Sequence, residues 1–169
     1  MGADKATLVL DGTTLAARAA AALREVADPC VEVGPGVSGL ASVQEDPPGG
    51  GPLLALAAAV AALPGDRAVL VVACDLPRLS VEVLRWLADH PADGSVVPLW
   101  EGRPQPLCAR WSAAALARVG PLVASGARSL QALIGATSPQ LVEPPRRLVP
   151  ALADVDTPGQ WERVRDIQS

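Results

Sequence analysis

The spacing of apolar positions divides the chain into alternating short strands and helices. Short apolar or β-branched runs predict strands, and apolar residues at intervals of three and four predict helices. Strands are expected at residues 7–10, 30–33, 40–44, 68–74, 95–100, 105–111 and 141–143. Helices are expected at residues 15–26, 53–63, 80–90, 112–122 and 129–134, and from residue 158 onward. This alternation predicts an α/β domain with a mostly parallel sheet.

Turn and capping residues support several of these boundaries. Asp11-Gly12 is a turn dipeptide, and Thr13 or Thr14 can cap the helix that follows it. Ser80 is placed to cap the helix at residues 80–90. Near the end of the chain, Thr157-Pro158-Gly159-Gln160 has the pattern of a capping box with proline at the first helical position.

Two segments are apolar without a break. Residues 68–74 predict a central strand of a parallel sheet, because such strands are covered on both faces. Residues 53–63 form the longest apolar stretch, preceded by Pro52 in a favourable first-turn position. A helix that is apolar nearly all round is expected to be buried on most of its faces.

Length and composition indicate one soluble domain over residues 1–169. Half of the 169 residues are hydrophobic, which excludes a disordered chain, and no repeat or linker divides the sequence. The net charge of −4 argues against a nucleic-acid module or a polybasic membrane binder. A membrane helix needs about 20 apolar residues, and residues 53–63 fall short of that. The polar first residues do not resemble a signal peptide, so a cytoplasmic location is expected.

Several reactive residue types are expected to be structural. Cys30, Cys74 and Cys108 are odd in number and widely spaced, which predicts buried apolar side chains rather than a disulfide framework or a zinc site. His90 is expected to be solvated or to cap a helix end. The four tryptophans are spread along the chain and are expected to serve packing.

Three features are candidates for chemistry. Asp75 directly follows the apolar strand, where α/β sheets bind ligands and where a carboxylate can hold Mg²⁺; the alternative is a helix cap. Lys5 is the single lysine among 13 arginines, and its compact charge suits phosphates; the alternative is a solvated residue near the chain start. Asp46 precedes the glycines at residues 49–51, where a helix start could bind an anion; the alternative is a plain turn.

Taken in order, six short segments resemble one family, the molybdenum cofactor guanylyltransferases of the nucleotidyltransferase superfamily. They span the chain in the order of the family's motifs. The segments are Met1-Gly2-Ala3-Asp4-Lys5-Ala6, Gln44-Glu45-Asp46 with Gly51-Pro52-Leu53, Ala73-Cys74-Asp75-Leu76-Pro77, Glu101-Gly102-Arg103-Pro104-Gln105-Pro106-Leu107, Arg128-Ser129-Leu130 and Asp154-Val155-Asp156-Thr157-Pro158.

The resemblance implies a three-layer, Rossmann-like nucleotidyltransferase fold with a mostly parallel mixed sheet, and a reaction. In that reaction a terminal phosphate of molybdopterin attacks the α-phosphorus of GTP, and pyrophosphate leaves with Mg²⁺ as cofactor. Carried over by position, Lys5 and Asp75 would be catalytic, Lys5 contacting the nucleotide phosphates and Asp75 holding both Mg²⁺ and GTP. Asp46 would bind the nucleotide. These residue types suit a transfer that depends on positioning and charge stabilisation.

Three departures from the family pattern matter. The glycine-rich opening that should stand just before Met1-Gly2 is absent, together with the central first strand that feeds it. We therefore hypothesise that Met1 is an internal methionine of a longer protein. The family's asparagine after the second strand has no counterpart at Val33-Gly34, which weakens recognition of the base or ribose. Ala55 stands where the family often has glycine.

Several alternatives stay open. One is a related enzyme that uses CTP or another phosphorylated acceptor. Another is a truncated, non-catalytic paralogue that binds the cofactor or acts as its chaperone. A third is an unrelated α/β domain. If the chain is a molybdenum cofactor guanylyltransferase, the expected partners are GTP, molybdopterin and a recipient molybdoenzyme or its chaperone. Neither nucleic acid nor a membrane is expected to be involved.

Overall fold

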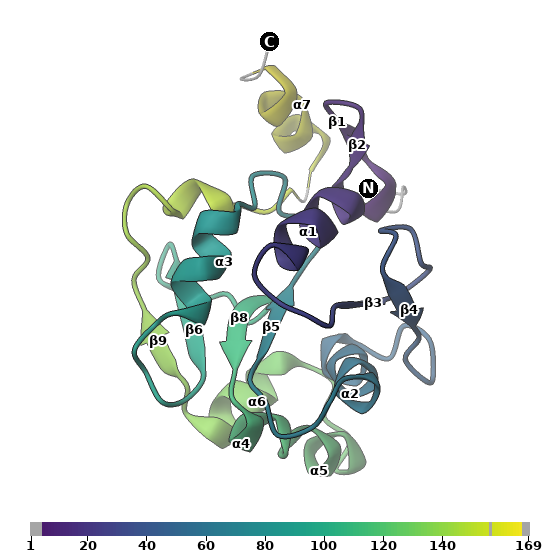
Figure 1. The fold of residues 1–169 in the computed structure, drawn as a ribbon, viewed down its shortest axis with the longest axis vertical. Helices are drawn as coiled ribbons and strands as arrows, with labels where there is room; N and C mark the ends of the chain where they lie inside the picture. Colours follow the sequence, from purple (N-terminus) through teal and green to yellow (C-terminus); the bar gives the residue numbers. More distant parts are fainter. Residues whose placement is uncertain (1–4, 156, 167–169) are drawn as a thin grey trace.

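A computed structural model describes residues 5–155 and 157–166 (Figure 1). The strands are β1 (Val9–Leu10), β2 (Thr13–Thr14), β3 (Val31–Val33), β4 (Ala41–Val43), β5 (Val69–Val72), β6 (Val96–Trp100), β7 (Arg103–Pro104), β8 (Cys108–Trp111) and β9 (Gln140–Val142). The α-helices are α1 (Leu15–Arg24), α2 (Pro52–Ala62), α3 (Val81–Ala88), α4 (Ala113–Leu116), α5 (Val119–Ala124), α6 (Leu130–Thr137) and α7 (Pro158–Asp166). Two 3₁₀ turns, η1 (Lys5–Thr7) and η2 (Val149–Leu152), complete the elements.

The main sheet is mixed. Its strands lie in the order β9, β6, β8, β5, with β7 attached to the end of β6 (Figure 1). β6 and β9 are parallel, whereas β5 and β6 both run antiparallel to β8. β3 and β4 form a separate parallel pair. The expected α/β architecture is confirmed, but a mostly parallel sheet is not evident among the described strand pairs.

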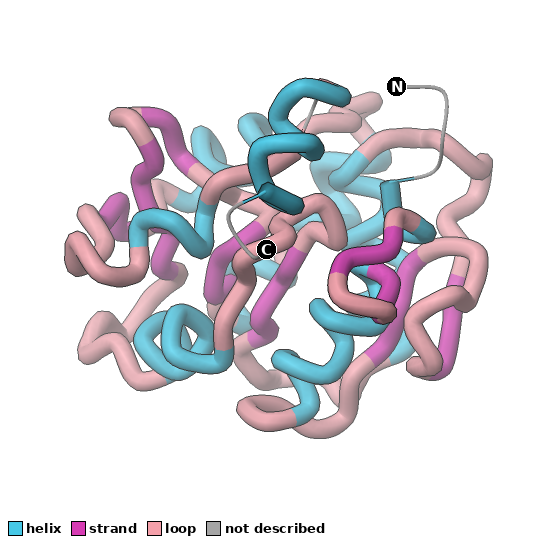
Figure 2. The backbone as a smooth tube through the Cα atoms, turned by 90° about the horizontal axis from the view of Figure 1, so that it is seen from above, coloured by secondary structure: helices cyan, strands magenta, loops and turns pink. Residues whose placement is uncertain are grey.

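Helices cover both faces of the main sheet, so the molecule has three layers. Neighbouring strand residues point to opposite sides, as the pleat requires. Val96 and Cys108 pack with α3, the end of α1 and η2, whereas Val97, Ala109 and Trp111 pack with α2 and α4 to α6. Figure 2 shows the strands flanked by helices from a second direction. This confirms the three-layer expectation.

Local signals in the sequence place most element ends. Asp11 and Gly12 both have positive φ and form the two-residue turn between β1 and β2. The Thr14 hydroxyl accepts the backbone N–H of Ala17 at 3.2 Å and caps α1, and Ser80 caps α3 in the same way. Gln160 and Thr157 bond reciprocally at the start of α7, which confirms the predicted capping box.

The structure corrects two expectations about burial. In α2 only Leu53, Leu54 and Leu56 are buried, so the helix is not covered on most faces as predicted. Ala55 and Ala59 stay partly open on the side of the helix that lines a cavity between β3 and β5. Of the cysteines, Cys108 is buried, but Cys30 and Cys74 are only half-buried, and all three are free thiols.

Two further differences concern single elements. The predicted helix at residues 112–122 is broken into α4 and α5, with a turn at residues 117–118 between them. The predicted strand at residues 68–74 is shorter, as β5, and it pairs with one neighbour only among the described strands. Within residues 5–155 and 157–166, no helix has the length and apolar character needed to cross a membrane.

Candidate functional site

The structure brings Lys5 and Asp75 together. The Lys5 Nζ donates to Asp75 Oδ2 at 3.2 Å, although 70 positions separate the two residues. Their side chains remain 30% and 26% exposed, so both stay accessible to a ligand. An ion pair with this much solvent contact contributes at most about 1 kcal/mol to stability. The fold therefore has little structural need for this pair.

Backbone hydrogen bonds fix the position of Asp75. β5 ends at Val72, and the N–H of Ala73 donates to the carbonyl of Leu107 at 2.7 Å. The carbonyl of Asp75 itself accepts the N–H of Val155 at 3.1 Å. The carboxylate thus stands at the carboxyl end of β5, held from two sides by chain segments distant in sequence. The same position at the end of a strand is where open α/β sheets bind ligands.

Four of the six motif segments identified in the sequence meet around Asp75. Residues 73–77 carry the carboxylate, and Lys5 belongs to the first segment. Leu107 closes the segment that begins at residue 101, and Val155 lies in the last one. Because no secondary-structure rule requires these four segments to meet, their convergence supports a shared site.

The other two motif segments meet each other. The N–H of Leu53, in the first turn of α2, donates to the carbonyl of Arg128 at 3.0 Å. Gly51 precedes it with φ of 100°, and a Cβ built there would lie 2.8 Å from the same carbonyl. Only glycine fits this position without strain. The approach of these backbones explains why the sequence has glycine directly before Pro52.

Asp46 is not joined to Lys5 and Asp75 by any contact that the structure gives. Its side chain is exposed in the loop between β4 and α2. Two backbone donors of that loop are already used: Gly49 donates to the Glu45 carboxylate and Gly50 to the carbonyl of Pro47. The N–H of Leu53 is also hydrogen-bonded, and Pro52 has no N–H to donate. These observations favour a plain turn over an anion site in this glycine loop.

Asp75 fits one mode of Mg²⁺ binding. Among the described residues, no group of three or more His, Cys, Asp or Glu side chains is close enough to form a metal cage. Mg²⁺ is commonly held by one or two carboxylates, with water and substrate phosphates completing its coordination. Asp75 is a partly exposed carboxylate at a strand end, which matches this mode of Mg²⁺ binding. The single carboxylate therefore fits a metal ion that arrives together with a nucleotide.

Two backbone contacts that position the Asp75 segment, one at Ala73 and one at Asp75, were not singled out from the sequence. Leu107 and Val155 contribute through backbone atoms, which leave no trace in side-chain chemistry. In the sequence, only the order of the motif segments that contain these two residues could have pointed to their contacts. Asp154 stands beside Val155 and is half-buried, so it is a second carboxylate carried by a segment that reaches the site.

The remaining reactive side chains are structural. Burial raises the pKa of the Cys108 thiol to about 12, and burial also raises that of Cys30, so neither is an activated nucleophile. His90 accepts the N–H of Ala92 at 3.3 Å and lies edge-on to Trp86, as expected for a residue that closes a helix end. Trp111 is fully buried, which confirms a packing role for that tryptophan.

Sequence comparisons point to one family. The sequence model of the MobA-like NTP transferase domain matches residues 1–141. A probable molybdenum cofactor guanylyltransferase of Mycobacterium tuberculosis is 36% identical over 148 residues, covering 81% of this chain and 74% of the relative. A protein of the same description from Opitutus terrae is 33% identical, covering 98% of this chain and 86% of the relative.

Solved structures share the fold. Molybdopterin-guanine dinucleotide biosynthesis protein A from Archaeoglobus fulgidus superposes with a TM-score of 0.72 at 18% identity, covering 99% of this chain and 91% of that one. 2-C-methyl-D-erythritol 4-phosphate cytidylyltransferase from Thermus thermophilus superposes with a TM-score of 0.68 at 20% identity, covering 98% and 94%. The expected nucleotidyltransferase fold is confirmed.

Proposed function

Because the chain belongs to the MobA-like NTP transferase family and is a nucleotidyltransferase-like protein, we propose that it transfers GMP from GTP to the molybdopterin cofactor and releases pyrophosphate. The observation that carries the proposal is the contact between Lys5 and Asp75 at the carboxyl end of β5. It supplies one cation for phosphate and one carboxylate for a metal. Both stand on segments that resemble the family's motifs.

In the proposed mechanism the nucleotide separates the ion pair. Lys5 turns its ammonium group from Asp75 to the triphosphate and offsets the negative charge that grows on the leaving pyrophosphate. Asp75 is thereby released to bind metal. Since the pair contributes at most about 1 kcal/mol, it can open without a large loss of stability. The two groups thus hold each other in place until substrate arrives.

Mg²⁺ is the metal that the proposal assigns to Asp75. When bound, it would screen the phosphate charges and help to align the α-phosphorus for attack. The backbone bonds from Val155 and Leu107 hold the residues around the carboxylate in a fixed position. Catalysis by positioning and electrostatics needs such rigid placement, because no covalent bond to the protein is formed.

Asp46 is proposed to bind the nucleotide through its sugar or base rather than its phosphates. Its carboxylate is an acceptor only, and it is exposed and distant in sequence from the pair. Hydroxyl and amino groups of a nucleoside are matching donors. The choice of GTP over CTP, and of molybdopterin over another phosphorylated acceptor, rests on the names of the relatives.

A titration with both nucleotides tests the proposal. The protein purified from its own host is mixed with Mg²⁺ and GTP or CTP, and pyrophosphate is measured with and without molybdopterin. We expect release with GTP that requires both Mg²⁺ and acceptor. Release with CTP alone would shift the assignment to a cytidylyltransferase. Binding of molybdopterin without pyrophosphate release would instead support the non-catalytic alternative.

A further inference from the structure

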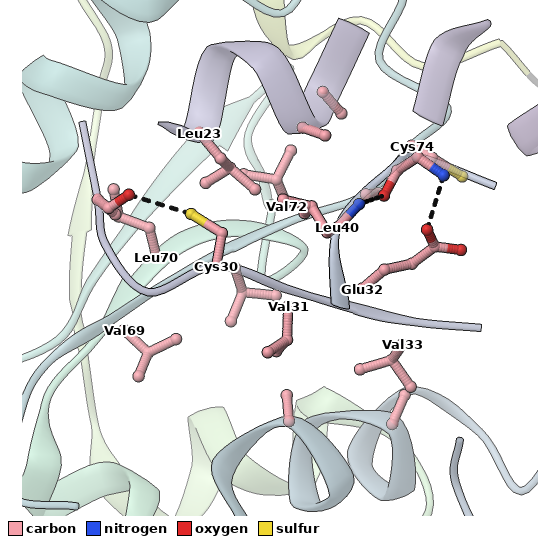
Figure 3. Close-up of a pocket in the computed structure, with 18 of the residues that line it drawn as sticks. Leu23, Cys30, Val31, Glu32, Val33, Leu40, Val69, Leu70, Val72 and Cys74 are labelled. Carbon is pink, nitrogen blue, oxygen red and sulfur yellow. Dashed lines mark hydrogen bonds between the residues drawn. The ribbon is translucent and has the colours of Figure 1, made fainter. Parts of the chain in front are cut away.

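The hairpin of β6 and β7 stands at the same edge of the main sheet as Asp75. β5 and β6 both run antiparallel to β8, so their carboxyl ends lie at one edge. Asp75 follows the end of β5, and the hairpin turns at the end of β6. On the side of β5 away from β8, Asp75 borders the apolar cavity that Figure 3 shows, with Cys74 at one end. The mechanism proposed above leaves the hairpin, on the other side, without a role.

Backbone hydrogen bonds hold the hairpin beside the end of β5. Residues 101–102 form its two-residue turn, and both have positive φ, as the twist of a tight hairpin requires. On the returning chain, the N–H of Gln105 donates to the carbonyl of Pro98 at 2.9 Å. Two residues later, the carbonyl of Leu107 accepts the N–H of Ala73 at 2.7 Å. The returning chain therefore lies between β6 and the segment that carries Asp75.

Trp100 and Arg103 stand directly opposite each other in this hairpin. Opposite residues of an antiparallel pair project from the same face of the sheet, with their Cβ atoms about 5 Å apart. Trp100 packs against the core cluster that contains Leu76, the residue after Asp75. Both side chains are therefore on the face of the sheet to which the chain turns after Asp75.

Both side chains are also accessible to a ligand. Trp100 is only partly buried, and Arg103 is exposed. Within the part of the chain that the structure describes, the guanidinium of Arg103 has no hydrogen bond or ion pair. Trp111 differs from Trp100: it is fully buried, and its indole N–H donates to the carbonyl of Pro106 at the base of the hairpin. The fold thus uses one tryptophan to hold the hairpin and leaves the other open beside a cation.

The proposed reaction brings two anions together, so it needs a cation besides Lys5. An oxygen of the acceptor phosphate bonds to the α-phosphorus of GTP, while the bond from that phosphorus to the bridging oxygen breaks and pyrophosphate leaves with its electron pair. The incoming phosphate is repelled by the triphosphate unless a positive charge offsets it. A guanidinium binds phosphate through two parallel N–H bonds, which both offset the charge and fix the orientation. An open indole face stacks on planar rings.

We propose that Trp100 and Arg103 form the acceptor subsite of the candidate active site. Arg103 binds the phosphate of the acceptor, and Trp100 stacks on its ring. The ligand class is a phosphorylated planar heterocycle, to which molybdopterin belongs. The inference rests on the proposed function, because it takes Lys5 and Asp75 to hold the nucleotide while the acceptor approaches from the side of the hairpin.

Arg103→Gln tests the cation, with Arg118→Gln as the matched control. Arg118 is likewise exposed, but it follows α4, which begins at the opposite edge of the sheet, where β8 ends. Binding of molybdopterin is measured by calorimetry without GTP, and the KM values for GTP and molybdopterin are measured separately by pyrophosphate release. We expect Arg103→Gln to raise the Kd and KM for molybdopterin about 10- to 100-fold, because charge-assisted hydrogen bonds are lost. The KM for GTP should stay within about twofold, and Arg118→Gln should match the parent.

Trp100→Leu and Trp100→Phe test the ring. Leucine keeps an apolar side chain but removes the stacking surface, so we expect the Kd for molybdopterin to rise about tenfold. Phenylalanine retains an aromatic face and should restore most of the affinity, which a purely structural role of Trp100 does not require. The urea unfolding midpoint of each variant shows whether it is folded as the parent is.

The outcomes separate this inference from the proposed function. If the parent releases pyrophosphate and Arg103→Gln behaves like Arg118→Gln, the acceptor subsite is overturned and the proposed function stands. A rise in the KM for GTP alone would also overturn the subsite, because it would place Arg103 against the nucleotide. Equal affinities of Trp100→Leu and the parent would overturn the stacking role. A parent protein that neither binds molybdopterin nor releases pyrophosphate would overturn the proposed function, and this inference with it.

Discussion

The single lysine stands where arginine geometry is not needed. Arg110 shows how this chain uses a guanidinium: it donates to the carbonyls of Ala88, His90, Ala92 and Gly94 and holds that loop together. Lys5 instead contacts Asp75 through a compact charge on a flexible stem. A composition that favours arginine almost everywhere therefore has its single lysine at the position for which we propose phosphate binding.

Asp75→Asn tests the carboxylate at the residue scale. The amide keeps the size of the side chain but loses the charge that would hold Mg²⁺. We expect kcat to fall about 10²–10³-fold, equivalent to about 3–4 kcal/mol. The midpoint of urea unfolding should change little, because the ion pair is part-exposed. Asp66→Asn, at an exposed loop position, is the control and should leave both measurements unchanged. Full turnover by Asp75→Asn would remove this residue from the mechanism.

Lys5→Arg tests whether the site needs the compact ammonium group of lysine or only a positive charge. The planar fork of arginine keeps the charge and can still pair with Asp75, so stability should be retained. We expect kcat/KM for GTP to fall at least about tenfold, because the fork cannot approach the phosphates as the ammonium does. Steady-state kinetics with varied GTP measures the change. Equal rates for both residues would mean that the lysine is incidental.

At the scale of elements, Gly51 connects α2 to the segment before α6. Gly51→Ala places a Cβ 2.8 Å from the carbonyl of Arg128 at a φ of 100°. We expect a loss of about 1–3 kcal/mol in unfolding free energy from this strained backbone. Gly135→Ala is the matched control, because it lies inside α6 with open space around the new methyl group. There alanine should stabilise the helix by up to about 1 kcal/mol. Chemical denaturation compares the two variants.

Glu32 holds the loop after β3 through its carboxylate. We therefore expect the stability of the protein to depend on pH in the acidic range. Its carboxylate accepts the N–H groups of Gly36 at 2.8 Å, Val37 at 3.0 Å and Ser38 at 2.8 Å. Burial tends to raise the pKa of Glu32, but hydrogen bonds from the Ser38 side chain and from these backbone N–H groups outweigh it and lower the pKa below 4.5. Because the folded pKa lies below the unfolded value, the stabilisation is present above pH 4.5 and is lost as pH falls through the folded pKa.

Glu32→Gln should therefore remove part of the acid sensitivity. We expect the variant to be less stable than the parent near neutral pH and to approach it as the pH falls below 4.5. Thermal unfolding followed from pH 7 to pH 3 measures the difference between the two proteins. Glu25→Gln, at an exposed position, is the control and should run parallel to the parent. A constant difference across this range would contradict the role given to the carboxylate.

Element types were predictable where a local rule decides them. The caps at Thr14 and Ser80 and the turn at Asp11-Gly12 depend on neighbouring residues only, and all three are confirmed. Strand partners were not predictable in this way. The apolar run at residues 68–74 predicted a central parallel strand, yet β5 pairs antiparallel with β8 and has no second partner among the strands that the structure describes. Partner choice depends on long-range contacts that periodicity does not encode.

At the scale of the whole molecule, the order of the motif segments predicted more about the site than any single residue did. Lys5 and Asp75 are in contact, whereas Asp46 stays apart from them, and the roles of all three residues remain predictions. The backbone contacts from Leu107 and Val155 could not be found from side-chain types, because any residue can supply them. Asp75 also lines the cavity next to β5, so the candidate site and the cavity adjoin each other.

The most direct test of the account is the product formed by the protein from its own host, given GTP, Mg²⁺ and molybdopterin. We expect one pyrophosphate to be released for each guanine dinucleotide of the cofactor that forms. We also expect Asp75→Asn to lose both products together. Guanine dinucleotide formation that persists at the full rate in this variant, or cofactor binding with no pyrophosphate in the parent protein, would contradict it.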